Sequence, residues 1–171
     1  MVVVRRATLD DAAAIGRAHA ASWRVAYASL GDAYLASIED DERIALWARV
    51  LADGESHTFV AVNEEDAVVA FVNLRASRDG GADSSTGEVV AIYAAPAAWG
   101  TGAGRALMDA AVQELRALGF ANATLWVLDT NTRARRFYEI AGWAPDGAEK
   151  DEVWRGAAIH ELRYTRPIPS P

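Results

Sequence analysis

Three glycines alternate where an apolar, strand-like run ends and a helical pattern begins. Gly100, Gly102 and Gly104 follow the run 88–94, and Arg105 stands in the first turn of the helical pattern. At such a junction glycines let backbone N–H groups converge, and the N-terminus of the helix adds a partial positive charge. The spacing therefore predicts a loop that binds phosphate, with a plain tight turn between strand and helix as the alternative.

Two familiar phosphate loops do not match this turn. A Walker loop ends in Gly-Lys-Ser or Gly-Lys-Thr, and this turn does not. A dinucleotide-binding fingerprint has the form G-x-G-x-x-G near the first strand, with an acidic residue about 20 positions further on. This turn has the form G-x-G-x-G and lies past the middle of the chain. A phosphate loop of another kind is therefore expected.

The turn lies within an alternation of strand-like and helix-like segments. Thr8 and Asp11 form a capping-box pattern at the start of the first helix, and Gly119 and Gly142 end two later helices. The patterns predict strands over 2–7, 57–62, 68–74, 88–94, 124–128 and 159–165, and helices from 8 to about 22, over 32–51 with a break near 37–40, over 103–118 and over 131–141. This order predicts an α/β fold with three layers, α-β-α, around a mixed sheet. We expect residues 1–171 to form a single domain.

Composition and charge exclude several classes of protein. The chain has 17 basic and 24 acidic residues, no cysteine and 51% hydrophobic residues. These numbers argue against disorder, disulfides, thiolate chemistry and general nucleic-acid binding. No apolar run reaches the roughly 20 residues of a membrane span, and charge follows the first residues too soon for a secretory signal. We therefore expect a cytoplasmic protein that binds neither membranes nor nucleic acid. The three histidines are scattered without ligand spacing, so no metal site is expected.

Two parts of the chain resemble motifs of the GNAT superfamily of N-acetyltransferases. Trp99–Gly104 is similar to the acyl-CoA pyrophosphate loop, Gln/Arg-x-x-Gly-x-Gly/Ala, and Ile92–Pro96 is similar to the strand end before that loop. Asn131–Trp143 resembles the segment Asn-x-x-Ala-x-x-Phe-Tyr-Glu-x-x-Gly-Phe. The expected order of elements agrees over nearly the whole chain. The one departure in the first motif is Trp99, where Gln or Arg is usual.

The resemblance implies acetyl-CoA as co-substrate and a central sheet whose two middle strands splay apart. The amides of 100–105 would hold the pyrophosphate, the strand edge at 92–94 would pair with pantetheine, and an N–H near Ala94 would polarise the acetyl carbonyl. Arg133 and Arg136 would face the nucleotide phosphates, or else form a solvated helix face. Asn131 would contact the cofactor, or serve only as a helix N-cap. The implied cofactor-binding residues are Ile92, Tyr93, Ala94, Trp99, Gly100, Thr101, Gly102, Ala103, Gly104, Arg105, Asn131, Arg133, Arg136 and Tyr138.

Transfer of an acetyl group to an amine also needs an acid for the departing thiolate and a base for the ammonium group. The resemblance implies that Tyr138 lies near the sulfur of CoA and protonates the thiolate, which a phenol with a pKa of about 10 can do. The alternative for Tyr138 is a core aromatic residue. Glu88 is the first candidate for the base, acting directly or through water, and an exposed charge at a strand end is its alternative. Asp129 is the second candidate.

Substrate selectivity is expected near the first helix. Trp23 and Tyr27 fall on one helical face, where similar acetyltransferases bind the acceptor, and with Asp129 they are the candidate substrate-binding residues. Core packing is the alternative for the two rings, although a cationic amine could use them by cation–π contact. Residues 1–85 carry a net charge of −6 and residues 99–138 carry +2. This distribution suits a cationic substrate and an anionic cofactor.

The expected function is transfer of an acetyl group from acetyl-CoA to a primary amine, by direct attack. The amine belongs to a small molecule or a peptide N-terminus, and its identity is left open. One alternative is a non-catalytic acyl-CoA-binding or sensory module of the same fold, and another is a mononucleotide-binding domain with a similar turn. Paired subunits are common in the superfamily, so a homodimer is among the expectations.

Overall fold

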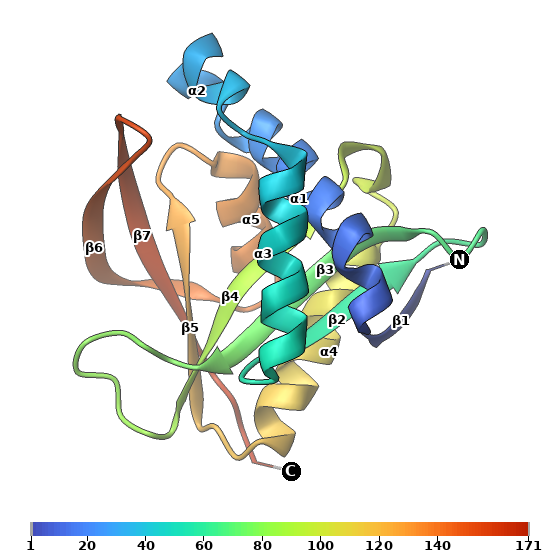
Figure 1. Ribbon diagram of the computed structural model, residues 1–171. Helices are drawn as coiled ribbons and strands as arrows, with labels where there is room; N and C mark the ends of the chain where they lie inside the picture. The colour runs from blue at the N-terminus through green and yellow to red at the C-terminus, as the bar shows by residue number, and fades with distance from the viewer. Residues whose placement is uncertain (1, 171) are drawn as a thin grey trace. The chain divides into compact units, whose positions relative to one another are not determined.

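The computed structural model describes residues 2–170, and its helices and strands are labelled in Figure 1. The strands are β1 (Val3–Arg6), β2 (His57–Val62), β3 (Val68–Ala76), β4 (Thr86–Ala94), β5 (Asn122–Leu128), β6 (Ala144–Trp154) and β7 (Ala157–Pro167). The α-helices are α1 (Ala12–Ala26), α2 (Asp32–Ala36), α3 (Asp40–Asp53), α4 (Ala103–Ala117) and α5 (Thr132–Ile140). The strand order in the sheet is β1-β2-β3-β4-β5-β7-β6. The sheet is mixed, because β4 and β5 are parallel whereas β1–β2, β2–β3, β5–β7 and β6–β7 are antiparallel.

The chain clusters into two compact units. The first unit contains residues 2–74 and 91–111, and the second contains residues 75–90 and 112–170. Across residues 2–170, none of the helices is long and apolar enough to cross a membrane.

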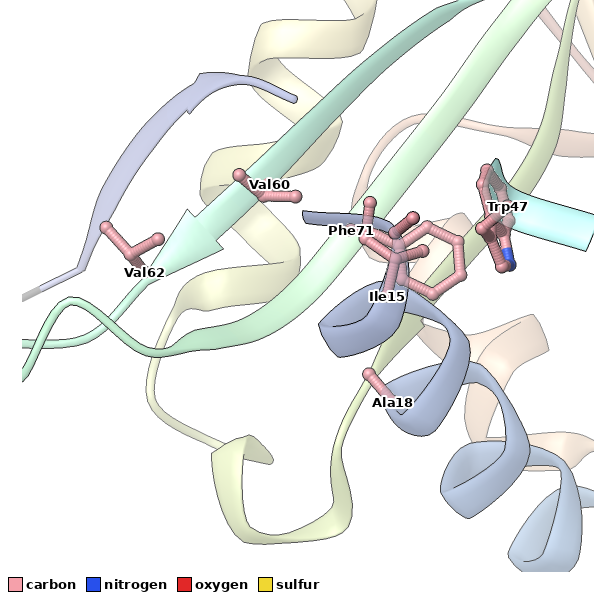
Figure 2. Close-up of a cluster of buried hydrophobic side chains, with 7 residues drawn as sticks. Ile15, Ala18, Trp47, Val60, Val62 and Phe71 are labelled. Carbon is pink, nitrogen blue, oxygen red and sulfur yellow. The ribbon is translucent and has the colours of Figure 1, made fainter. Parts of the chain in front are cut away.

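In the first unit, α1 and α3 pack against β2 and β3. Figure 1 shows the two helices side by side, and Figure 2 shows Ile15 and Ala18 of α1 near Phe71 of β3, with Trp47 of α3 beside the Phe71 ring. The buried core cluster consists of Ala12, Ile15, Ala18, Trp47, Val60, Val62 and Phe71. Gly16 of α1 allows α3 to pack closely against α1, because a Cβ atom there would lie 2.6 Å from the backbone N and Cα atoms of Ile44 in α3.

The predicted start of the first helix is confirmed. A 3-10 turn, Leu9–Asp11, leads into α1, and the Thr8 backbone N–H donates to Asp11 Oδ2 at 2.7 Å. Arg5 Nη1 lies 2.8 Å from the same oxygen. The predicted break near 37–40 is also present, because α2 ends at Ala36 and α3 begins at Asp40.

In the second unit, β5 is paired on both of its edges. It pairs with β7 from Asn122↔Pro167 to Leu128↔Glu161, and with the start of β4 from Thr86↔Asn122 to Glu88↔Thr124. Leu125 and Val127 are buried on one face of β5, and Tyr164 of β7 is fully buried. Trp126 belongs to the other face, as does Glu88, because Glu88 lies beside Thr124 in the register.

One strand was not expected from the sequence. The patterns predicted no strand between Gly142 and Ile159, but β6 occupies Ala144–Trp154 and pairs with β7. The segment is rich in charged residues and so has a low intrinsic preference for strand. It lies last in the strand order, however, and charge on an edge strand discourages pairing with other chains. The local sequence signal for this hairpin was the glycine of the pair Arg155–Gly156. In the structure these two residues have the positive φ angles of a two-residue hairpin turn, +50° and +81°.

Candidate active site

The glycine turn lies in the first unit and leads from β4 into α4. Gly100 and Gly102 have φ angles of +78° and +90°, which glycine adopts without strain. The Thr101 hydroxyl donates to the Ala98 carbonyl at 2.7 Å and braces the turn. Because α4 begins at Ala103, its first backbone N–H groups have no carbonyl one turn earlier in the helix. The turn therefore has the backbone geometry of an anion site at a helix N-terminus.

Arg105 adds a positive charge to the first turn of α4. Its Nε atom lies 3.3 Å from Oδ2 of Asp109, one turn further along the helix, and both side chains are exposed. An exposed pair of this kind contributes at most about 1 kcal/mol. The Arg105 guanidinium can therefore exchange Asp109 for an incoming anion at little cost.

The end of β4 is held by hydrogen bonds from three directions. The Ala95 backbone N–H donates to the Val69 carbonyl of β3 at 2.9 Å. The Ala94 carbonyl accepts from the Ser22 hydroxyl at 2.8 Å and from the Trp99 indole N–H at 2.9 Å. Trp99 thus makes a side-chain hydrogen bond to the end of β4. Ser22 was missed by sequence reasoning, because nothing near it in the chain links α1 to the end of β4.

Trp23 of α1 and Tyr27, which caps the C-terminal end of α1, belong to a larger aromatic cluster. Their ring centroids are 5.0 Å apart, and the Tyr27 ring is 5.9 Å from that of Tyr34. Tyr27 is buried, whereas Trp23 is half-buried and carries the Arg43 guanidinium 4.1 Å from its ring centroid. A cation therefore already lies on the Trp23 ring.

His19 extends this cluster to the end of β4. Its ring stacks on that of Tyr93 with 4.9 Å between centroids, and its Nδ1 accepts from the Trp47 indole N–H at 2.9 Å. Burial, and after it the charge of Arg43, lower the pKa of His19 to about 3. His19 is therefore neutral, with its proton on Nε2, and belongs to the aromatic core.

Tyr138 lies on α5 in the second unit, and Asn131 directly precedes that helix. Tyr138 is 7% exposed, and its ring lies 5.5 Å from that of Phe137 and 6.2 Å from that of Tyr164. Asn131 is the N-cap of α5, and its Oδ1 accepts from the Ala134 N–H at 3.1 Å. The cap thus orients the helix that carries Tyr138.

The three arginines of α5 differ in their surroundings. Arg133 and Arg136 are exposed on the helix, as a phosphate-binding or a solvated face requires. Arg135 instead donates to the Asp129 carbonyl at 3.0 Å and to the Tyr164 hydroxyl at 3.2 Å. Arg135 therefore anchors α5 to the backbone carbonyl of Asp129 and to Tyr164. The Asp129 N–H donates to the His160 carbonyl at 3.0 Å, and its side chain is half-buried after β5.

Glu88 is a half-buried carboxylate near the start of β4. Burial is the main cause that raises its pKa, and the charge of Asp79 acts in the same direction. The Arg78 backbone N–H, 3.5 Å from Oε2, and the charges of Arg75 and Lys150 oppose this shift. A carboxylate with a raised pKa is a stronger base, as proton abstraction from an ammonium group requires.

A network of charges surrounds Trp126 on the same sheet face as Glu88. The Trp126 indole N–H donates to Asp79, and the cations of Lys150 and Arg163 lie 4.6 and 5.6 Å from its ring centroid. Lys150 Nζ lies 3.1 Å from Oε2 of the buried Glu161. Sequence reasoning missed this network, although the alternation of Glu161 with Arg163 on β7 was a signal for a polar face.

The candidate residues are divided between the two units. The strand end 92–94, the turn 99–105 and the aromatic pair Trp23 and Tyr27 belong to the first unit. Glu88, 129–133, Arg136 and Tyr138 belong to the second. Among residues 2–170, no group of three or more His, Asp or Glu side chains is placed to hold a metal ion.

Comparison with known proteins identifies the family. Residues 20–143 match the model of the acetyltransferase (GNAT) family. The chain is 33% identical to the uncharacterized N-acetyltransferase YuaI of Bacillus subtilis over 135 residues, which is 77% of this chain and 74% of that protein.

Two solved structures show the same fold at low sequence identity. The PaiA N-acetyltransferase of Thermoplasma acidophilum, in complex with coenzyme A, has a TM-score of 0.72 at 16% identity and is matched over 98% of this chain and 99% of its own. The protein yncA of Salmonella typhimurium, with its cofactor acetyl-CoA, has a TM-score of 0.74 at 19% identity over 100% and 96%. The expected α/β class with a mixed, splayed sheet is thereby confirmed. The family model, the relative and the fold agree, and the chain belongs to the acetyltransferase (GNAT) family.

Proposed function

We propose that this protein transfers the acetyl group of acetyl-CoA to a primary amine. The observation that carries the proposal is the turn between β4 and α4, where glycines at positive φ open the N-terminus of α4 beside the strand end at Ala94. This is a site for a phosphate group next to a strand edge that can pair with an extended chain. CoA has both parts, a pyrophosphate and a pantetheine arm with amides.

On the donor side, the amides of 100–105 hold the pyrophosphate and Arg105 adds positive charge. The strand edge at 92–94 pairs with the pantetheine arm, and the Ala94 N–H donates to the thioester oxygen, where negative charge develops during attack. Asn131, Arg133 and Arg136 contact the nucleotide end. The solved complexes of PaiA with coenzyme A and of yncA with acetyl-CoA support this choice of ligand.

In the transfer step, the amine nitrogen forms a bond to the thioester carbon and the carbon–sulfur bond breaks. Glu88 takes the proton of the ammonium group, directly or through water, so that a lone pair is available for attack. Tyr138 gives its phenolic proton to the departing thiolate, and the second proton that the nitrogen loses as the amide forms restores the phenol. The raised pKa of Glu88 supports its role, because a stronger base removes an ammonium proton more readily.

On the acceptor side, Trp23, Tyr27 and Asp129 recognise a cationic amine of a small molecule or a peptide N-terminus. The acidic surplus of residues 1–85 supports a cationic acceptor. The cytoplasmic location, the pairing of subunits and the assignment of 1–171 to one domain stay predictions from the sequence.

The test is release of free thiol from acetyl-CoA across a panel of amines that includes amino acids, polyamines, aminoglycosides and short peptides, at several pH values. The proposal expects amine-dependent thiol release with at least one acceptor. Thermal stabilisation by CoA without thiol release would favour a non-catalytic acyl-CoA-binding module. Tighter binding of ATP or NAD than of acetyl-CoA would favour a mononucleotide-binding domain and contradict the proposal.

A further inference from the structure

Two side chains from outside β4 donate hydrogen bonds to one of its carbonyls. The Ser22 hydroxyl of α1 lies 2.8 Å from the Ala94 carbonyl oxygen, and the Trp99 indole Nε1 lies 2.9 Å from it. Ser22 is 5% exposed, so its hydroxyl has little access to water. Ser22 Oγ is also 2.8 Å from the Ala18 carbonyl oxygen, so the single hydroxyl proton is shared between a carbonyl of its own helix and that of Ala94.

The same peptide group is held from the opposite side. The nitrogen of the Ala94–Ala95 peptide donates to the Val69 carbonyl of β3 at 2.9 Å. In a strand, the N–H and C=O of one residue point to one edge and those of the next residue point to the other. Because Ala95 bonds to β3, the N–H of Ala94 points away from β3. Ser22 and Trp99 therefore hold the residue whose N–H points away from β3.

We propose that Trp99 and Ser22 are positioning residues for the acetyl donor, and that they hold the end of β4 so that the Ala94 N–H stays aimed at the thioester oxygen. This inference rests on the proposed function, because it assigns that N–H to the acetyl group. A donor aimed in advance costs no reorganisation when charge develops on the oxygen. Neither side chain needs to touch the donor itself.

The two hydrogen bonds from Ser22 and Trp99 to the Ala94 carbonyl form a clamp on the end of β4. This clamp limits which carbonyl the pantetheine arm can use. The Ala94 carbonyl already accepts two hydrogen bonds, so an amide N–H of the arm has to use another carbonyl of the strand. Ile92 is the preceding residue whose backbone points to the same edge as that of Ala94. Trp99 also begins the turn that contains Gly100 and Gly102, so one side chain connects the phosphate loop to the strand end.

The first experiment removes the two donors singly and together. Trp99→Phe keeps an aromatic ring and removes the indole N–H, and Ser22→Ala removes the hydroxyl. Loss of one neutral hydrogen bond changes an equilibrium by about two- to tenfold. We expect each variant to raise the KM for acetyl-CoA by that factor, with a smaller change in the KM for the amine.

The double variant, Ser22→Ala with Trp99→Phe, tests the proposal more stringently than either single variant. The two donors share one acceptor, so either alone still satisfies the Ala94 carbonyl, whereas loss of both leaves it without a side-chain donor. The KM for acetyl-CoA should therefore rise by more than the product of the two single effects. Trp99→Gln restores an N–H donor and should recover part of the loss. Trp154→Phe is the matched control, because it removes an indole N–H that bonds to Glu152 on the β6–β7 hairpin.

A donor without the pyrophosphate separates the strand end from the phosphate loop. If the clamp acts at Ala94, the double variant loses activity with S-acetyl-pantetheine as it does with acetyl-CoA. Equal activity of wild type and double variant with S-acetyl-pantetheine would overturn the proposal, as would single and double variants with an unchanged KM for acetyl-CoA.

Hydrogen exchange of the free protein tests the clamp without any donor. Amide exchange over 92–98 should accelerate in the double variant and stay at the wild-type rate in Trp154→Phe. Unchanged exchange over 92–98 would overturn the clamp. If wild-type protein neither binds CoA nor releases thiol, the proposed function fails, and the exchange measurement still shows whether Ser22 and Trp99 hold the strand end.

Discussion

The indole N–H of Trp126 donates to Asp79, with Nε1 2.9 Å from Oδ1. Asp79 lies in the segment between β3 and β4, so this bond ties the segment to the sheet face that carries Glu88. Arg163 Nη1 lies 3.3 Å from the other carboxylate oxygen of Asp79. Because the charge of Asp79 raises the pKa of Glu88, this contact also influences the protonation of the candidate base.

Asp79→Asn should shift the pH dependence of acetyl transfer. The variant keeps an oxygen that can accept from Trp126 but removes the charge that raises the pKa of Glu88. A base must be deprotonated to act, so activity rises with pH through the pKa of Glu88. If the pKa of Glu88 is lower in the variant, the rise of kcat/KM on the acidic side of the pH profile should occur at lower pH. Asp146→Asn is the control, because Asp146 pairs with the same Arg163 at 2.8 Å, and an equal shift there would contradict the role of Asp79.

Tyr138→Phe should slow turnover and leave CoA binding intact. Loss of a general acid typically costs about 10²–10⁴-fold in rate, whereas removal of one hydroxyl leaves the packing of the ring on α5 in place. The measurement is single-turnover thiol release beside a titration of CoA affinity. Tyr164→Phe is the control for the loss of a phenolic hydroxyl beside α5. The Tyr164 hydroxyl bonds to Glu139 at 2.9 Å and to Arg135, both on that helix. A Tyr138→Phe enzyme with the wild-type rate would remove Tyr138 from the mechanism.

Asp11→Asn should destabilise the fold in a pH-dependent way. The Arg5 guanidinium, and then the N–H and hydroxyl of Thr8, hold the pKa of Asp11 below its usual value of 3.8 against the effect of burial. A carboxyl whose pKa is lowered by folding stabilises the native state above its unfolded pKa, and loses this contribution as pH falls through its folded pKa.

The free energy of unfolding at pH 7 should therefore fall by about 1–2 kcal/mol in Asp11→Asn. The difference from wild type should shrink as the pH falls below about 4. Urea unfolding at both pH values measures this. Asp10→Asn, in the same turn but exposed, should change stability little at either pH. A difference for Asp11→Asn that is constant with pH would contradict the ion pair as its cause.

Gly16→Ala should destabilise the protein although alanine favours helix. An alanine Cβ at this position would lie 2.6 Å from the backbone N and Cα atoms of Ile44, so α1 and α3 would have to move apart. Overpacking of this kind costs about 1–3 kcal/mol, more than the gain of up to about 1 kcal/mol in helix propensity. Ile44→Ala would remove the side-chain Cγ1 atom, 2.7 Å from that Cβ, but not the two backbone atoms, so it should not restore the stability of the variant in thermal unfolding. Rescue would show that the Ile44 side chain sets the contact.

Local features of this fold were predictable because their causes are local. The capping box of Thr8 and Asp11 needs only four consecutive residues, and Asn131 caps α5 as its side chain allows. Gly119 and Gly142, which follow α4 and α5, have φ angles of +85° and +86°. The two motifs that indicated the family are also contiguous stretches, so their chemistry could be recognised without knowledge of the packing.

Contacts between distant parts of the chain could not be predicted in this way. Ser22 and Ala94 are 72 positions apart, and Trp126 and Asp79 are 47 apart. Which side chains meet depends on strand register and helix packing, and a shift of one residue turns a side chain to the other face. The strand β6 was missed for the same reason, because its pairing with β7 outweighs the low strand preference of its charged residues.

The glycine turn was evident from the chain alone, because backbone conformation at Gly100 and Gly102 and the start of α4 depend on nearby residues. The electrostatics of the candidate site were not evident from the chain alone. Burial raises the pKa of Glu88 and lowers that of His19, and burial results from the packing of segments far apart in the chain. Local sequence therefore indicated which chemistry to expect, and tertiary packing set the protonation and aim of the groups that would perform it.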